Sequence, residues 1–163
     1  MLVVSNTSPL SNLAIIGRLE LLREQLGAVL IPPAVRAELD RHPSLAARGA
    51  LEAGVQDGWI RVSQLTSPVR EELAASLDQG EAEAISLALQ VGASLVLLDE
   101  SAARRQAARL GLGLTGVLGV LRRARETGRI ASLKDEIRKL RTDARFFIHP
   151  GLEKALLLSV AET

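Results

Sequence analysis

The segment from residue 94 to residue 100 constrains the fold more than any other part of the chain. It reads Ser-Leu-Val-Leu-Leu-Asp-Glu, an apolar run that follows Gly92 and ends in an acidic pair. Such a run is typical of a strand that is buried on both faces of a sheet. A carboxylate at the end of that strand lies at the rim of a parallel sheet, where open α/β folds bind their ligands.

Strand and helix patterns alternate along the whole chain. Strands are predicted over 2–5, 28–31, 59–62, 94–98 and 112–115. Helices are predicted over 9–22, 34–40, 44–54, 68–77, 80–91, 100–110, 116–126, 132–141 and 150–160. We expect Ser8 and Pro9 to cap and open the first helix, which should break near Gly17. Strands that are separated by helical crossovers predict an α/β fold, a three-layer sandwich with helices on both sides of four to five mostly parallel strands.

The length and the hydrophobic content fit one domain of ordinary size. The chain has 163 residues, of which 47% are hydrophobic. We predict a single domain over 1–163, in which residues 132–163 form a helical extension that packs on the core or forms an interface. No secretory signal pattern is visible, and no apolar run approaches the ~20 residues that cross a bilayer. We therefore expect a cytoplasmic protein without a membrane partner.

The composition narrows the chemistry that the chain can perform. It has no cysteine, which excludes disulfides, thiolate chemistry and zinc sites with sulfur ligands. Its two histidines, His42 and His149, lie far apart in the sequence, so histidine-based metal sites and catalytic triads are poorly supplied. An enzyme of this composition depends mainly on carboxylates.

Positive charge is concentrated in one part of the chain. The net charge is only +1, but seven of the 17 arginines lie between residues 104 and 129, where the only acid is Glu126. Such a field suits a phosphate-bearing partner, and the alternative is solvated charge on helix faces. Aromatic residues make up only 2% of the chain, which argues against stacking on bases as the main contribution to binding a nucleic acid. The candidate phosphate contacts are Arg104, Arg105, Arg109, Arg122 and Arg123.

Oxygen-bearing side chains follow the predicted strands. Asn6, Glu38 and Asp99 lie at or just beyond strand ends, and Glu81 begins the helix that leads into the strand before Asp99. Each has a plain alternative: Asn6 turns the chain, Glu38 is solvated, Glu81 favours a helix start, and Asp99 caps the helix from residue 101. Together, such like charges would repel unless a cation neutralised them, and Mg²⁺ or Mn²⁺ prefers this oxygen ligand set.

Four motifs in order resemble a known family. They are Asn-Thr-Ser-Pro-Leu at 6–10, Pro-Pro-Ala-Val-Arg-Ala-Glu-Leu at 32–39, Gly-Glu-Ala-Glu-Ala-Ile at 80–85, and Leu-Leu-Asp-Glu at 97–100. With these motifs the chain resembles the PIN domains, a fold of metal-dependent nucleases, and within them a prokaryotic, toxin-like subgroup. The likeness covers most of the chain.

The resemblance implies a function and a site. It implies an endoribonuclease that uses Mg²⁺ or Mn²⁺ to hydrolyse RNA phosphodiester bonds, leaving a 3′-hydroxyl and a 5′-phosphate. Carried over by motif, the metal-binding and catalytic positions are Asn6, Glu38, Glu81 and Asp99, with Ser8 and Glu100 as auxiliary candidates. The resemblance further implies the toxin of a toxin–antitoxin pair, silenced by a cognate antitoxin protein, and a homodimer.

Three further features keep alternatives open. Active PIN nucleases carry aspartate at the first acidic position, whereas Asn6 brings no charge, so the alternative is a weakened or inactive domain that binds RNA or protein. A Gly-x-Gly-x-x-Gly pattern at 111–116 invites a dinucleotide site, but Gly111 closes a predicted helix instead of following a strand, so no dinucleotide is expected. Phe146 and Phe147 precede a leucine-rich helix that covers the core or forms a dimer or antitoxin surface.

Overall fold

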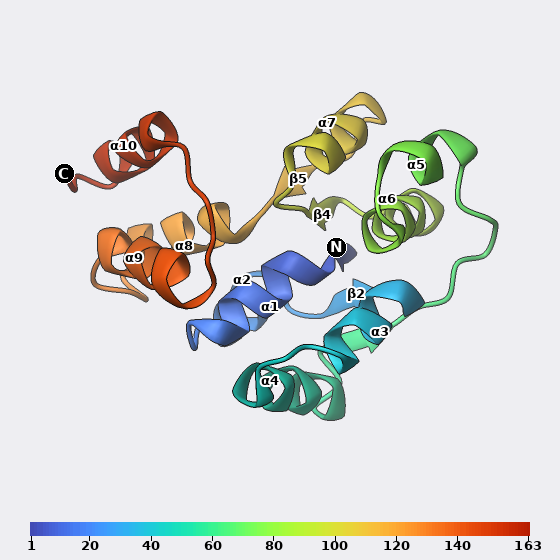
Figure 1. Cartoon of the computed structure of the whole chain (residues 1–163), viewed down its shortest axis with the longest axis horizontal. Helices are drawn as coiled ribbons and strands as arrows, with labels where there is room; N and C mark the ends of the chain where they lie inside the picture. Colours follow the sequence, from blue (N-terminus) through green and yellow to red (C-terminus); the bar gives the residue numbers. More distant parts are fainter.

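A five-stranded sheet lies at the centre of the computed structural model, which describes all of residues 1–163 (Figure 1). Every neighbouring pair of strands is parallel, and the strand order is β3-β2-β1-β4-β5. The predicted α/β fold with four to five central strands is therefore confirmed. The strands are β1 (Val3–Ser5), β2 (Val29–Ile31), β3 (Ile60–Val62), β4 (Leu95–Leu97) and β5 (Leu114–Thr115).

Ten helices surround the sheet, and none combines the length and apolar character that a membrane-spanning helix needs. The first predicted helix is two helices, separated near Gly17, whose φ of 72° ends the first one. The residue that precedes this first helix is Asn6, so the expectation that Ser8 caps it is wrong: Ser8 and Pro9 lie in its first turn. The helices are α1 (Thr7–Ile15), α2 (Glu20–Leu26), α3 (Pro33–Asp40), α4 (Leu45–Gln56), α5 (Glu71–Ser76), α6 (Gln79–Val91), α7 (Ser101–Arg109), α8 (Val117–Glu126), α9 (Leu133–Asp143) and α10 (Pro150–Ser159).

The two faces of the sheet are buried in different hydrophobic clusters. Val4, Val96 and Leu98 point into a smaller cluster that α5, α6 and α7 complete. Val3 and Leu97, which alternate with them along the strands, belong to a larger cluster of residues from the other helices. Figure 1 shows α5, α6 and α7 together on one side of the strands, with α1, α2 and α4 on the other. This burial on both faces explains the continuous apolar runs of β1 and β4.

The C-terminal helices pack on the larger cluster. Leu133, Ile137 and Leu140 of α9 and Leu157 of α10 are all buried in it. Glu162, just beyond α10, accepts hydrogen bonds from the backbone amides of Leu133 and Lys134 at 2.8 and 3.1 Å. The end of the chain therefore fastens α10 to the start of α9, and both helices lie at the opposite end of the molecule from α5 (Figure 1).

Truncation of Leu97 tests the importance of the central strand pair. Leu97 is fully buried on β4, so Leu97→Ala should lower the free energy of unfolding by about 2–5 kcal/mol. The matched control is Leu45→Ala, because Leu45 is 74% exposed and its loss should change stability by less than about 0.5 kcal/mol. Urea denaturation followed by circular dichroism measures both, and equal midpoints for the two variants would contradict this account of the core.

Candidate functional site

The strand order creates a switch point at the two central strands. From β1 the chain builds the sheet in one direction through β2 and β3, and in the other direction through β4 and β5. Open α/β sheets bind ligands beyond the carboxyl ends of the strands at such a point. Asn6 directly follows β1, and its backbone amide donates to the carbonyl of Leu97 at 3.1 Å, while Asp99 lies two residues beyond β4. Two of the predicted ligand positions therefore lie at the switch point.

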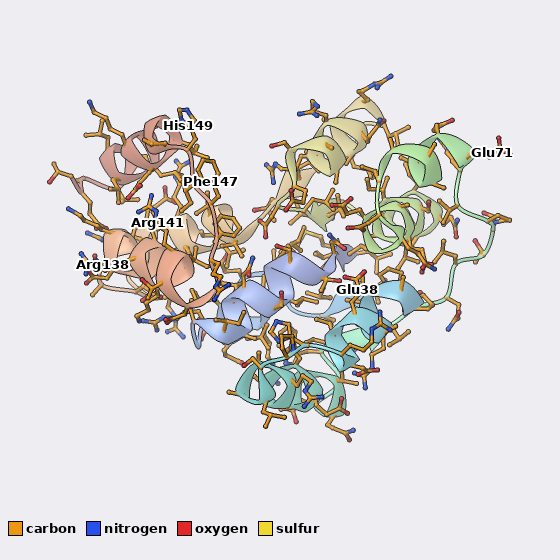
Figure 2. All side chains as sticks on the ribbon, in the orientation of Figure 1. Glu38, Glu71, Arg138, Arg141, Phe147 and His149 are labelled. Carbon is orange, nitrogen blue, oxygen red and sulfur yellow. The ribbon has the colours of Figure 1, made fainter.

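Asn6 and Glu38 converge over Gly80. Asn6 is 5% exposed, and its Oδ1 is buried without a hydrogen-bond donor. A Cβ atom added to Gly80, in the first turn of α6, would lie 3.2 Å from this oxygen and would overlap Oε1 of Glu38. Figure 2 shows Glu38 where α1, α3 and α6 approach one another. A buried oxygen without a donor costs about 1–3 kcal/mol, and a cation beside it removes that cost, so this pair of oxygens fits a hard divalent ion.

Glu81 has a structural role at the start of α6 as well as a charged environment. Asp78 and Glu81 form a reciprocal capping box, in which Oδ1 of Asp78 accepts from the Glu81 amide and Oε2 of Glu81 accepts from the Asp78 amide. Burial raises the pKa of Glu81; the bond from the Asp78 amide opposes this, and the charges of Asp78, Glu100 and Glu38 raise the pKa further. The predicted ligand Glu81 therefore lies in the electrostatic field of Glu38 and Glu100.

Asp99 is held by two donors from distant elements. Oδ2 accepts from the Ser8 hydroxyl at 3.0 Å, and Oδ1 accepts from the backbone amide of Val117 at 2.9 Å. Ser8 in turn accepts from Nδ2 of Asn12 at 3.0 Å. The alternative role for Asp99, as the cap of the helix from residue 101, is therefore wrong. Asp99 binds the first turn of α8, and Glu100, whose side chain forms no cap bond, precedes α7.

Burial also raises the pKa of the Asp99 carboxyl, although the bonds from Val117 and Ser8 and the charge of Arg104 act in the opposite direction. Its geometry is fixed before any ligand arrives, because both oxygens already have donors. Ser8, predicted as an auxiliary group, orients Asp99 through its hydroxyl.

The predicted ligands share one rim but form two groups. Asn6 and Glu38 meet at Gly80, with Glu81 adjacent, whereas Asp99 is tied to Ser8 and α8. No three acidic or histidine side chains come close enough together to hold one metal ion. The four-residue ligand set therefore stays a prediction, and the residues that support a cation most directly are Asn6 and Glu38.

Several arginines of the basic region between residues 104 and 129 already have partners within the protein. Arg122 pairs with Glu126 on α8, and Arg104 donates to the backbone carbonyl of Leu98 at 2.7 Å. Arg129 pairs with Glu24, and Arg125 pairs with Glu162. Both acids lie far from these arginines in the sequence, so the sequence does not predict the pairs. The predicted phosphate contacts that are exposed and have no ion pair are Arg105, Arg109 and Arg123.

A cleft extends from Asp99 toward the C-terminal helices. Two cavities of about 400 and 440 Å³ share Asp99, Ser101 and Phe146. One wall is the connector between α9 and α10, and Figure 2 shows Phe147 on this connector. The sequence gives no reason to place this connector beside Asp99, because the two are brought together only by the packing of α9 and α10 on the core.

The glycine pattern at 111–116 has structural explanations. Gly111 ends α7 with a φ of 78°, which is the left-handed conformation that glycine favours after a helix. Gly116 precedes α8, where a Cβ atom would meet Oδ1 of Asp99 and the Leu98 carbonyl. The absence of a side chain at Gly116 therefore leaves room for the Asp99 carboxylate.

Neutralising Glu81 should stabilise the fold. Because its folded-state pKa is raised, the protonated carboxyl favours the fold in acid, and this advantage is lost as the pH rises through the folded pKa. Glu81→Gln keeps a carbonyl oxygen for the Asp78 amide, so it should raise the unfolding free energy at neutral pH by about 0.5–2 kcal/mol. The gain should disappear below the ordinary carboxyl pKa of about 4.3.

Glu162→Gln is the opposite control. Although burial raises the pKa of Glu162, hydrogen bonds from Leu133, Lys134, Arg125 and Ser132 outweigh it and lower the pKa. Its stabilisation is present at neutral pH and is lost in acid, so this variant should be less stable at neutral pH. Urea titrations across the pH range measure both; a loss of stability in Glu81→Gln at neutral pH would contradict the raised pKa.

Comparison with known proteins identifies the family of the chain. No curated protein matches the chain. The family model DUF3368, described as a PIN domain, matches residues 2–162, which is nearly the whole chain and includes every residue of the rim. PIN domains are generally nucleases, hydrolases of phosphodiester bonds. Because this model covers nearly all of the chain, the chain belongs to the PIN domains.

Proposed function

We propose that the protein is an endoribonuclease that uses Mg²⁺ or Mn²⁺ to hydrolyse RNA phosphodiester bonds. The observation that carries this proposal is the unpartnered, buried Oδ1 of Asn6 beside the Glu38 carboxylate at the switch point of a PIN-domain sheet. An amide oxygen and a carboxylate without bound donors are ligands for a hard cation. Membership in a family of nucleases supports the reaction class.

In this proposal the residues of the rim have different roles. Asn6 and Glu38 would hold the cation, with Glu81 as a further ligand. When bound, the cation would stabilise negative charge on the phosphate and lower the pKa of water. Asp99, oriented by Ser8 and Val117, carries a raised pKa and would accept or hold a proton near the scissile phosphate.

The exposed arginines supply the contacts to RNA in this proposal. Arg105 and Arg109 lie on α7, whose first residue, Ser101, lines the cleft beside Asp99. Arg123 lies on α8, whose first turn binds Asp99. Contacts of this kind position the phosphate backbone without reading its sequence.

Gly80→Ala tests the metal site with little risk to the fold. Alanine should stabilise the helix by up to about 1 kcal/mol, but its Cβ atom would displace the Glu38 carboxylate from Asn6. We expect Mn²⁺ affinity and RNA cleavage to fall at least about tenfold, the size of effect that loss of an orienting group has at metal sites.

The matched control is Gly49→Ala, since Gly49 is also helical and a Cβ atom there would meet nothing within 4 Å. It should gain the same stability and keep metal binding and cleavage. Calorimetric titration with Mn²⁺ and a cleavage assay on the same preparations measure the effect; wild-type affinity in Gly80→Ala would contradict the Asn6–Glu38 site.

Asp99→Asn tests the catalytic assignment. The amide keeps an acceptor for the Val117 amide but cannot exchange a proton, so cleavage should fall by about 10²–10⁴-fold, the usual range for a lost acid or base. Asp57→Asn, at an exposed carboxylate that follows α4, is the control and should cleave like the wild type. Equal rates for the two variants would refute a catalytic role for Asp99.

A second candidate function is binding of RNA or protein without cleavage. It is favoured by the amide at Asn6 and by the lack of three acidic side chains around one point. Asn6→Asp separates the two functions, because the added charge strengthens a cation site. If the wild type cleaves, the variant should cleave faster; if only the variant cleaves RNA, the natural protein is a binding module.

The biological setting is also part of the proposal. We propose that the protein acts in the cytoplasm as the toxin of a toxin–antitoxin pair, as a homodimer that an antitoxin protein silences. The support is the resemblance of its four motifs to the toxin-like subgroup. The exposed leucines of α10, Leu152 and Leu158, supply apolar surface for such contacts.

A further inference from the structure

The connector between α9 and α10 contains an arginine in a conformation that favours glycine. Arg145 has a φ of 53°, one of only two positive values outside glycine in the chain. Side chains with a Cβ atom are disfavoured in this region. The turn requires it, because the next amide, that of Phe146, bonds back to the carbonyl of Leu140 at 3.0 Å and closes α9. Glycine would adopt this turn at a lower conformational free-energy cost. The presence of arginine here therefore suggests that its side chain has a separate role.

Arg145 faces the proposed active site and is uncommitted. It is exposed, and no ion pair or side-chain hydrogen bond includes it, whereas the nearby Arg141 of α9 pairs with Glu153. It lines the 440 Å³ cavity together with Ser8, Asp99 and Glu100. A guanidinium that lines the same cavity as these carboxylates is placed to contact a phosphate that enters it.

Two of the three aromatic residues of the chain follow Arg145 directly. Phe146 and Phe147 both line the same cavity, and Phe147 is 82% exposed, the most exposed large hydrophobic side chain in the protein. Figure 2 shows Phe147 on the connector between α9 and α10. An exposed aromatic ring beside an arginine and a phosphate site is the combination that holds unpaired nucleotides, since every base has a face on which a ring stacks.

We propose that Arg145 and Phe147 form a nucleotide-binding subsite of the cleft. Arg145 contacts a backbone phosphate next to the scissile one, and Phe147 stacks on the base of an unpaired nucleotide. This inference rests on the proposed nuclease function and adds a substrate preference to it: an unpaired base exposes its face, whereas a base within a duplex does not. It adds one stacking contact to a surface on which, from the composition, contacts to the phosphate backbone are expected to dominate RNA binding.

Binding without cleavage tests the subsite. Fluorescence anisotropy with a short labelled single-stranded RNA in EDTA measures affinity for the wild type, Arg145→Gly and Phe147→Ala. Arg145→Gly suits the positive φ and therefore keeps the turn, yet affinity should fall about tenfold, and the dependence of log K on log salt should become shallower by about 0.7, the value for one phosphate contact. Phe147→Ala should weaken binding at least about fivefold and leave that dependence unchanged.

Two matched controls isolate the effects. Ala161→Gly relieves the other positive φ, 59°, at the far end of α10, and Leu45→Ala removes another exposed apolar side chain; neither should change RNA binding. Phe147→Trp adds an exposed indole to a protein whose only tryptophan, Trp59, is buried, so its fluorescence should be quenched by single-stranded RNA and much less by the same sequence in a duplex.

The outcomes separate the subsite from the proposed function. Wild-type affinity in both Arg145→Gly and Phe147→Ala, equal quenching by duplex, or no binding by the wild type would each overturn the subsite. Cleavage assays with Mn²⁺ on the same proteins test the nuclease proposal separately. A wild type that binds through Arg145 and Phe147 but cuts nothing would refute the nuclease and leave the subsite standing.

Discussion

The parallel pairing of β1 with β4 is the contact on which the rest of the structure depends. It joins residues that are about ninety positions apart, with Val4 opposite Val96 and Ser5 opposite Leu97. This register sets Asn6 beside the chain that leads to Asp99, and it completes both hydrophobic faces of the sheet. The crossover α6 and the helices that follow are then positioned around a rim that already exists. Since a slip by one residue would reverse every side chain of β4, the apolar run and the rim are specified together.

The rim costs stability, and its surroundings offset the cost. Glu81 and Asp99 are buried enough to raise their pKa values, and the Asn6 oxygen has no donor. Local bonds hold these groups in place: the capping box fixes Glu81, while Ser8 and the start of α8 fix Asp99. Burial of the two hydrophobic clusters supplies the free energy that offsets the cost of the buried polar groups at the rim. Such an expensive, prearranged set of oxygens is typical of a functional site.

Much of the fold could be read from the sequence, because its strands are short, apolar and bounded by turn residues. The run that contains β4 predicted a buried strand, and the alternation with helices predicted the parallel sheet. The start of α1 was harder, because Asn6, Thr7 and Ser8 are all residues that precede helices, and local preference does not choose among them.

The site was only partly predictable, since its details depend on contacts between distant segments. The predicted strand ends placed Asn6 and Asp99 at one edge of the sheet, but no local signal links Asp99 to Val117 of α8. The ion pairs of Arg125 and Arg129 with distant acids are equally invisible in the sequence. The conformation of Arg145 was hidden for a different reason: the usual marker of a positive φ is glycine, and glycine is absent there.

The strand order also fixes when the rim can come into being during translation. β1, β2 and β3 are complete by residue 62, whereas Asp99 and its partner Val117 are synthesised later. At about 5–20 residues per second, the ribosome separates Asn6 from Asp99 by roughly 5–20 s. A nascent chain therefore holds only one side of the rim at first, and the bond that fixes Asp99 can form only after Val117 has been made.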